Sequence, residues 1–328
     1  MARLKAEYLH FYHQKVPYSR RERMVTSAEK AGRWGVAFAP LSNWVIRQDW
    51  FRWILEKSVG FDRRRSLPPY ALETFERWFR DHTDQKASPR AEGRRVVLFD
   101  DTWMNYHEPD VGVAATRLLE AAGFEVVLGK KNCCGRPYIS KGMLNKAREM
   151  AEANIEALYP YAAEGCDIVG CEPSCLLSLR DEYPDLLPGP KAEMVAKHSF
   201  LIEEFFQRNG LDITFPSAPK EMLAHGHCHQ KALSGTEPLK AFLEKTGAKV
   251  NIVDSGCCGM AGAFGFETEH YDISLEMANR RLLPAVREAS KSTVLVAPGT
   301  SCRHQIVDGT GRRAYHPVEA VARAAGLI

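Results

Sequence analysis

A Cys-Cys-Gly triplet that occurs twice, in similar surroundings, constrains this chain more than any other feature. The first triplet occupies residues 133–135 and the second occupies residues 257–259, which is 124 positions later. The single cysteines Cys175 and Cys302 lie 127 positions apart, and the apolar segments that open each region, at residues 96 and 222, lie 126 apart. Three landmarks at nearly one offset predict a duplicated structural unit.

Strand-like and helix-like segments alternate within each of these units. Helical periodicity covers residues 111–122, 141–163, 237–246 and 267–287, and short apolar strands are expected at 96–99, 124–128, 167–170, 222–225, 249–254 and 293–297. This alternation is typical of parallel strands joined by crossover helices. The sequence therefore predicts an α/β fold with two tandem, pseudo-equivalent α/β units, each built on a short parallel sheet.

The first third of the chain differs in composition from the rest. It has no cysteine, reads as helical, and holds 20 Lys and Arg against 11 Asp and Glu over residues 1–95, although the whole chain carries only +3. We predict a basic helical segment at 1–94, a first α/β domain at 95–215 and a second at 216–328, with residues 82–95 as a linker. The basic charge suggests either a surface for an acidic partner or a membrane, or simply a solvated basic face. The aromatic residues of 47–58, beside arginines, can contact a membrane interface or a partner, but such residues are more often core, and we expect them there.

The cysteines of both units fall just after predicted strands. Loops at the carboxyl ends of parallel strands converge at one edge of a sheet, so distant residues can share a site there. The second unit offers Cys228, Cys257, Cys258 and Cys302 as metal ligands. The first unit offers Cys133, Cys134, Cys171 and Cys175. The second set is the more complete, because Asp101 or Thr102 stands where an earlier cysteine of the first unit is expected.

Clustered thiolates favour iron–sulfur clusters, zinc or copper(I), and four cysteines suit a 4Fe–4S cluster or structural zinc. Adjacent cysteines favour the multi-iron cluster, because tetrahedral zinc sites normally use spaced pairs. Gly135 and Gly259 would let the backbone approach the cofactor closely. The histidines of the segment HGHCHQ, residues 225–230, are expected to donate hydrogen bonds more often than to bind metal.

The segments NCCGRP, GCCGMAG, GCEPSC and GTSC resemble the cysteine-rich CCG domain. That domain occurs twice in the iron–sulfur subunits of glycolate oxidase, anaerobic glycerol-3-phosphate dehydrogenase and lactate-utilisation proteins, and it also occurs in heterodisulfide reductase. The segments HGHCHQKAL, DSGCCGMAGAFGFE, APGTSCRHQI and HPVE are also similar to the C-terminal part of fused FAD-linked oxidases of the D-lactate or D-2-hydroxyglutarate dehydrogenase type.

This resemblance implies an iron–sulfur electron-transfer subunit, or a fragment of a fused enzyme that follows its ferredoxin motifs. One 4Fe–4S cluster, cubane or non-cubane, is implied in the second unit, and a second cluster can be accommodated in the first. Electrons would come from FAD in a partner dehydrogenase or missing domain, with a ferredoxin-type Fe–S domain as a further partner, and leave to a quinone or other acceptor. The chain shows no flavin or nicotinamide fingerprint, so we assign no catalytic residue for the 2-hydroxy acid and no nucleic-acid partner.

Two alternatives remain open at this stage. One is a thiol–disulfide reductase of the heterodisulfide reductase kind, and the other is a zinc-stabilised scaffold without a redox role. No stretch approaches the ~20 apolar residues of a membrane span, and the N-terminus lacks the apolar core of a signal peptide. We therefore expect a cytoplasmic location, with peripheral attachment to the inner face of a membrane left open.

Overall fold

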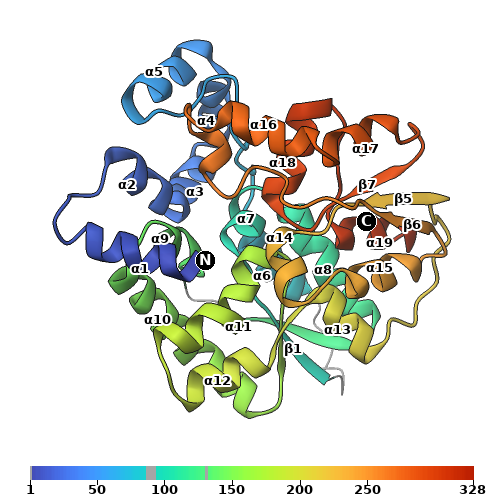
Figure 1. The fold of residues 1–328 in the computed structure, drawn as a ribbon. Coiled ribbons are helices and arrows are strands. Elements are labelled where there is room, and N and C mark those ends of the chain that lie inside the picture. Colours follow the sequence, from blue (N-terminus) through green and yellow to red (C-terminus); the bar gives the residue numbers. More distant parts are fainter. Residues whose placement is uncertain (1, 86–93, 130–131) are drawn as a thin grey trace.

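Two parallel sheets confirm the predicted α/β fold in the computed structural model, which describes residues 2–85, 94–129 and 132–328. The first sheet has the order β2-β1-β3-β4, and the second has the order β6-β5-β7, with every strand pair parallel (Figure 1). The strands are β1 (Arg94–Leu98), β2 (Phe124–Leu128), β3 (Asp167–Gly170), β4 (Ser199–Leu201), β5 (Glu221–Ala224), β6 (Lys249–Ile252) and β7 (Val294–Val296).

Helices cover both faces of the first sheet, because side chains alternate across each strand. The helices of this unit are α7 (Thr102–Tyr106), α8 (Pro109–Ala121), α9 (Arg136–Ser140), α10 (Leu144–Ala163), α11 (Pro173–Leu186), α12 (Pro190–Lys197) and α13 (Ile202–Asn209). Val96 and Leu98 pack toward α8 and α13, whereas Val97 packs toward α10, α11 and α12.

The second unit also alternates strands and helices, but one of its helices differs from the prediction. The single helix expected at 267–287 is two helices, separated at Arg280 and Arg281. In a continuous helix the ring of Pro284 would clash with the carbonyl group of Arg280, so the chain breaks and restarts with Pro284 in a first turn. The helices are α14 (Cys228–Leu233), α15 (Glu237–Glu244), α16 (Tyr271–Asn279), α17 (Leu282–Glu288), α18 (Thr300–Thr310) and α19 (Pro317–Ala324), with a 3₁₀ turn, η1, at Phe264–Phe266.

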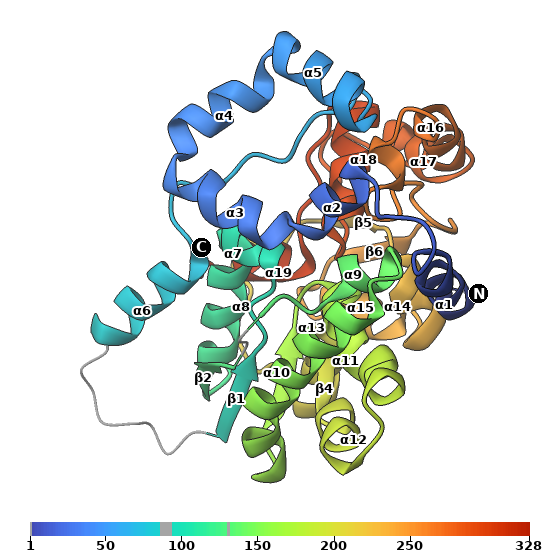
Figure 2. The ribbon, with the colours of Figure 1, turned by 90° about the vertical axis from the view of Figure 1, so that its left-hand side faces the viewer.

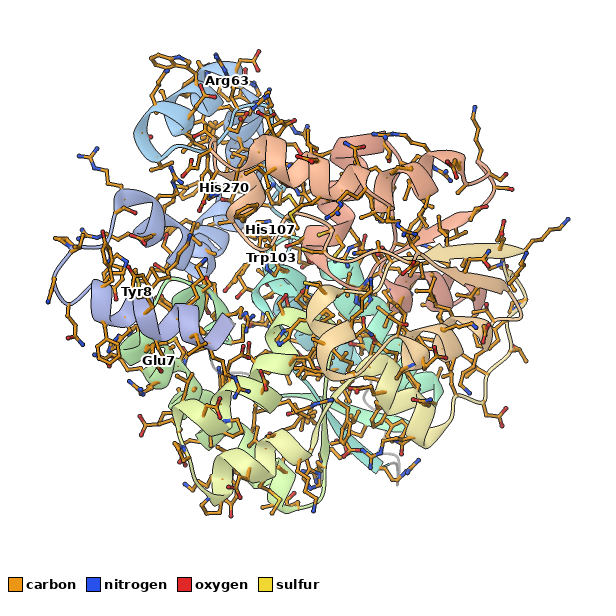
Figure 3. All side chains as sticks on the ribbon, viewed as in Figure 1. Glu7, Tyr8, Arg63, Trp103, His107 and His270 are labelled. Atoms are coloured by element: carbon orange, nitrogen blue, oxygen red, sulfur yellow. The ribbon has the colours of Figure 1, made fainter. Side chains whose placement is uncertain are left out.

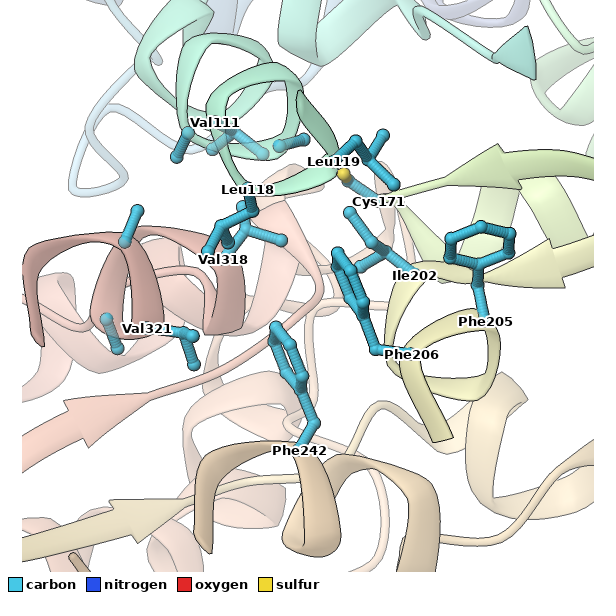
Figure 4. Packing of buried hydrophobic residues seen from close by; sticks show 14 of the residues in the cluster. Val111, Leu118, Leu119, Cys171, Ile202, Phe205, Phe206, Phe242, Val318 and Val321 are labelled. Atoms are coloured by element: carbon cyan, nitrogen blue, oxygen red, sulfur yellow. The ribbon is translucent and has the colours of Figure 1, made fainter. Parts of the chain in front are cut away.

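One apolar core joins the two units. It contains residues of α8 and α13 from the first unit together with residues of α15 and α19 from the second (Figure 4). Across this boundary the rings of Phe206 and Phe242 stack with centroids 5.4 Å apart. Because the same buried cluster serves both sheets, the position of one cysteine loop relative to the other is set by close packing.

The N-terminal segment lies against both units. It contains α1 (Ala2–Tyr12), α2 (Arg20–Thr26), α3 (Ala28–Ala37), α4 (Ala39–Arg47), α5 (Asp49–Val59) and α6 (Phe75–Gln85), of which α4 and α5 project as an arm in Figure 2. Arg65, which is buried, donates to the Gly265 carbonyl oxygen at 3.0 Å and to Gln305 Oε1 at 2.7 Å. Of the predicted linker, residues 82–85 end α6, residues 94–95 begin β1, and residues 86–93 lie outside the described residues.

Several aromatic side chains of this segment face solvent, so the expectation that those at 47–58 form core is wrong. Trp50 and Trp53 are 52 % and 49 % exposed, and α5 buries none of its residues. Tyr8 lies on the outer side of α1, and Arg63 follows α5 at the far end of the arm (Figure 3). Within the described ranges, none of the helices has the length and apolar character needed to cross a membrane.

Candidate metal centre

The four cysteines predicted in the second unit come together at the carboxyl edge of β5, β6 and β7. Cys228 opens α14 after β5, and the adjacent pair Cys257 and Cys258 lies in the loop after β6. Cys302 occupies the first turn of α18, after β7. Their thiols form a chain of contacts in the order Cys228, Cys257, Cys258 and Cys302.

Hydrogen bonds between neighbouring thiols shift the pKa values of all four cysteines in this set. Hydrogen bonds from Cys228 and Cys258 lower the pKa of Cys257 to about 2, and a hydrogen bond from Cys258 holds the pKa of Cys302 well below its usual range. The same contacts raise the pKa of Cys228 and of Cys258. The four thiols therefore share their protons as one group, and metal binding would replace these protons.

Donor groups surround the sulfur atoms of the second unit. The backbone N–H of Gly259 donates to Cys257 Sγ at 3.3 Å. Lys231 donates to the carbonyl oxygen of Ser255, which holds its ammonium group beside the Cys-Cys loop. Burial lowers the pKa of Lys231, and the nearby thiols of Cys302 and Cys228 oppose this shift. The surroundings thus offer positive charge and an N–H group to anionic sulfur.

The three histidines near Cys228 lie in different environments. His225 is buried, with its ligand nitrogen and the sulfur atoms of Cys258 and Cys302 all within 4.8 Å of one another. His227 caps α14 by accepting from the His229 N–H at 3.2 Å. His229 lies instead with Asp181 and Glu182.

In the first unit, three of the four predicted cysteines meet. Cys133 contacts Cys134, and Cys134 contacts Cys175. Cys171 belongs to the core shared by the two units, where it lies beside Leu119 and Ile202 (Figure 4). Alternation along β3 explains this position, because residues 169 and 171 face the shared core whereas residue 168 faces the other cysteines.

The first set differs from the second in the charged groups that lie near it. A hydrogen bond with Cys134 and burial raise the pKa of Cys133 well above its usual range. A hydrogen bond from Cys134 favours the Cys175 thiolate, but burial and the Asp101 carboxylate outweigh it and raise the pKa of Cys175 to about 12. Carboxylates therefore lie near Cys175 in the first set, and they disfavour additional negative charge there.

Buried polar side chains fix the first Cys-Cys-Gly loop. Asn154 donates to the Cys133 carbonyl oxygen at 3.1 Å, and Tyr183 donates to the Cys134 carbonyl oxygen at 3.0 Å. Glu29 of α3 accepts from the Cys133 N–H at 3.1 Å. These three residues were not singled out from the sequence, because each is remote from the cysteines along the chain and no motif marks it.

Direct polar contacts connect the cysteine loops of the two units. Glu172, between Cys171 and Cys175, accepts from the backbone N–H of Thr300 at 2.8 Å. Glu108 accepts from the hydroxyl group of Thr300 at 2.8 Å and forms an ion pair with the buried Arg303. Glu172 lies within the GCEPSC segment and was detectable there, whereas nothing near Glu108 in the sequence marks its role.

Comparison with known proteins agrees with the repeated pattern. Residues 96–180 and 223–307 each match the profile of the cysteine-rich domain designated CCG. One subunit of the anaerobic glycerol-3-phosphate dehydrogenase of Escherichia coli is 29 % identical over 314 residues, which cover 93 % of this chain and 77 % of that subunit.

Two further relatives differ in length from this chain. D-2-hydroxyglutarate dehydrogenase of Escherichia coli is 28 % identical over 97 % of this chain, which spans only 32 % of that enzyme. Lactate utilization protein A of Macrococcus caseolyticus is 29 % identical over 69 % of this chain and 93 % of its own length. The relatives include components of dehydrogenases, which supports an oxidoreductase-related role for the chain.

Proposed function

The chain belongs to the family of cysteine-rich CCG domain proteins, and from this premise we propose that it is an iron–sulfur electron-transfer component of a dehydrogenase. The observation that carries the proposal is the chain of four contacting thiols at the carboxyl edge of the second sheet. A partner with FAD would oxidise the substrate, and electrons would pass through this chain to a quinone or another acceptor.

The residues of the second unit suit an iron–sulfur cluster better than a single zinc ion. Cys257 and Cys258 are adjacent, and neighbouring irons of a cluster can each take one of two adjacent thiolates. Gly259 supplies a backbone N–H to sulfur, and Lys231 supplies positive charge close to the site. When bound, the cluster would supply one-electron chemistry, and the protein would set its position and reduction potential.

The side chains of the second site divide into an inner and an outer part. Cys258 and Cys302 are buried, so this part of the site excludes water, whereas Cys228 is exposed. The Cys228 side therefore offers the shortest approach for an electron donor or acceptor. We infer one cluster per chain, because the first unit gathers only three of its four thiols and has carboxylates near Cys175.

The proposed electron source is a flavin that oxidises an alcohol group, in the class of D-lactate, glycolate and D-2-hydroxyglutarate. The names of the three relatives support it, since they refer to lactate, D-2-hydroxyglutarate and glycerol 3-phosphate. The exposed aromatic residues of α3 to α5 and the basic charge of the N-terminal segment suit contact with the flavin-containing partner.

The proposal is tested by electron transfer with the isolated chain after anaerobic iron–sulfide reconstitution. We expect a photoreduced flavin to reduce the protein and a soluble quinone to reoxidise it, with about one electron taken up per cluster. Cys258→Ser should lose this capacity, whereas Cys166→Ser, outside both cysteine sets, should retain it.

D-lactate, D-2-hydroxyglutarate and glycerol 3-phosphate should not reduce the flavin-free chain. Turnover of any of them by this chain alone would contradict the proposal, as would a reconstituted protein that a reduced flavin cannot reduce.

A further inference from the structure

A buried imidazole places one ring nitrogen beside two cysteines of the second set. His225 directly follows β5 and is 1 % exposed. Its ligand nitrogen lies with Cys258 Sγ and Cys302 Sγ in a group whose members are all within 4.8 Å of one another. The three side chains come from three different loops, so the parallel sheet itself brings them together.

Ser255 holds the other nitrogen of the His225 ring. His225 Nδ1 lies 2.8 Å from Ser255 Oγ, which leaves Nε2 as the ring nitrogen for the cysteine site. In a neutral imidazole one ring nitrogen donates and the other accepts, so the tautomer with its proton on Nδ1 gives Nε2 a free lone pair.

His225 Nε2 is buried and lacks a well-aligned hydrogen bond among the described residues, although the ring interacts with the Cys302 side chain. A buried polar atom without such a bond is unfavourable, so the position favours a ligand that accepts a lone pair. Histidines that bind metals normally donate their other ring N–H to a fixed oxygen atom. The contact between Nδ1 and Ser255 Oγ has this arrangement.

The neighbouring histidines lack this combination. His227 uses both ring nitrogens, since Nδ1 accepts from the His229 N–H and Nε2 lies 3.3 Å from Ser174 Oγ. His229 Nδ1 is also unpaired among the described residues, but that ring lies with two carboxylates and not with the sulfur atoms. Of the histidines in this segment, His225 is therefore the one placed to bind a metal of the cysteine site.

We propose that His225 is a fifth protein ligand of the second site and binds one iron of the cluster through Nε2. The inference rests on the proposed function, because it assumes that an iron–sulfur cluster occupies the site. A neutral imidazole contributes less negative charge than a thiolate, and histidine ligation is associated with a higher reduction potential. His225 would therefore raise the potential of the cluster above that of an all-cysteine site.

The test is electron–nuclear double resonance on the whole reconstituted chain, labelled with ¹⁵N-histidine, in its paramagnetic state. We expect one strongly coupled nitrogen, as direct ligation produces. His225→Gln should lose this signal, and His229→Gln, a matched change four positions away, should retain it. His225→Cys should keep the cluster and lower its reduction potential. This second variant keeps the test decisive if His225→Gln does not fold.

Two outcomes are distinguishable without any variant. A wild-type cluster with only weakly coupled nitrogen would overturn the ligand assignment and leave the proposed function intact, since hydrogen bonds produce weak coupling. A wild-type chain that takes up no iron would instead overturn the proposed function, and the ligand assignment with it.

Discussion

Gly259 shows how strictly a single residue can fix the geometry of the second site. Its φ is +92°, in the left-handed region that favours glycine, and a Cβ atom there would overlap the carbonyl oxygen of Ser274. Gly262, in the same loop, has φ +66° but open space around it. The two glycines share a backbone conformation and differ in what surrounds them.

We expect Gly259→Ala to lower the free energy of unfolding by more than about 2 kcal/mol beyond the effect of Gly262→Ala. The first substitution adds a clash with backbone to the strain of positive φ, and the second adds strain alone. Urea unfolding of the two variants, followed by circular dichroism under anaerobic conditions, measures the difference. Equal losses would show that contact with Ser274 does not constrain the loop.

At the scale of single residues, the sequence predicts which cysteines of the second unit meet, but it does not predict how the side chains around them are oriented. The spacing of Cys228, Cys257, Cys258 and Cys302 was enough to predict that they meet, because each follows a strand. The direction in which His225 Nε2 points was not predictable from the sequence, because it depends on the side-chain orientations of His225 and Ser255. Side-chain orientation of this kind is set by tertiary contacts.

At the scale of elements, strands were easier to predict than helix ends. β2 and β3 have the bounds read from the sequence, since both are short apolar runs closed by polar or glycine residues. The division between α16 and α17 was missed, although Pro284 marks it, because the apolar spacing continues across the break. The short strand β4 carries only three residues and gives too weak a pattern to detect.

Strand alternation also decides which cysteines of the first unit share a face. The first set was predicted as four residues after two strands, without regard to side-chain direction. Counting along β3 shows that Cys171 points with Val169 toward the shared core. The same count applied to the sequence would have separated Cys171 from Cys133, Cys134 and Cys175.

At the scale of the whole molecule, an ion pair between Glu108 and the buried Arg303 joins the two units beside their cysteine loops. Arg303 is 7 % exposed and also donates to the carbonyl oxygens of Ala297 and Pro298 at 2.9 and 2.7 Å. Burial raises the pKa of the Glu108 carboxyl, but attraction to Arg303 and hydrogen bonds outweigh it and lower that pKa to about 2. Sequence reasoning missed this pair because its members lie 195 positions apart.

We expect Glu108→Gln to lower the free energy of unfolding by about 1–3 kcal/mol at neutral pH, because it removes the carboxylate paired with the buried Arg303 guanidinium while Glu172 and Glu319 remain near it. The folded-state pKa of Glu108 lies below the ordinary value of 4.5, so this stabilisation is complete above about pH 4.5 and is lost as the pH falls toward 2. Unfolding curves of wild type and variant should therefore converge in acid.

Glu156→Gln, which breaks an exposed pair with Lys191, serves as the control and should change stability little at any pH. A Glu108→Gln variant as stable as this control at pH 7 would show that the pair does not hold the units together.

The most direct test of the central claim is the iron and acid-labile sulfide content of the anaerobically reconstituted chain, measured with the EPR spectrum of its reduced form. Wild type and Cys166→Ser should contain iron and sulfide in nearly equal amounts, about four of each per chain, with an EPR signal. Cys258→Ser should lose both the metal and the signal. Zinc alone, or no metal with nine free thiols, would contradict the assignment of this protein as an iron–sulfur electron carrier.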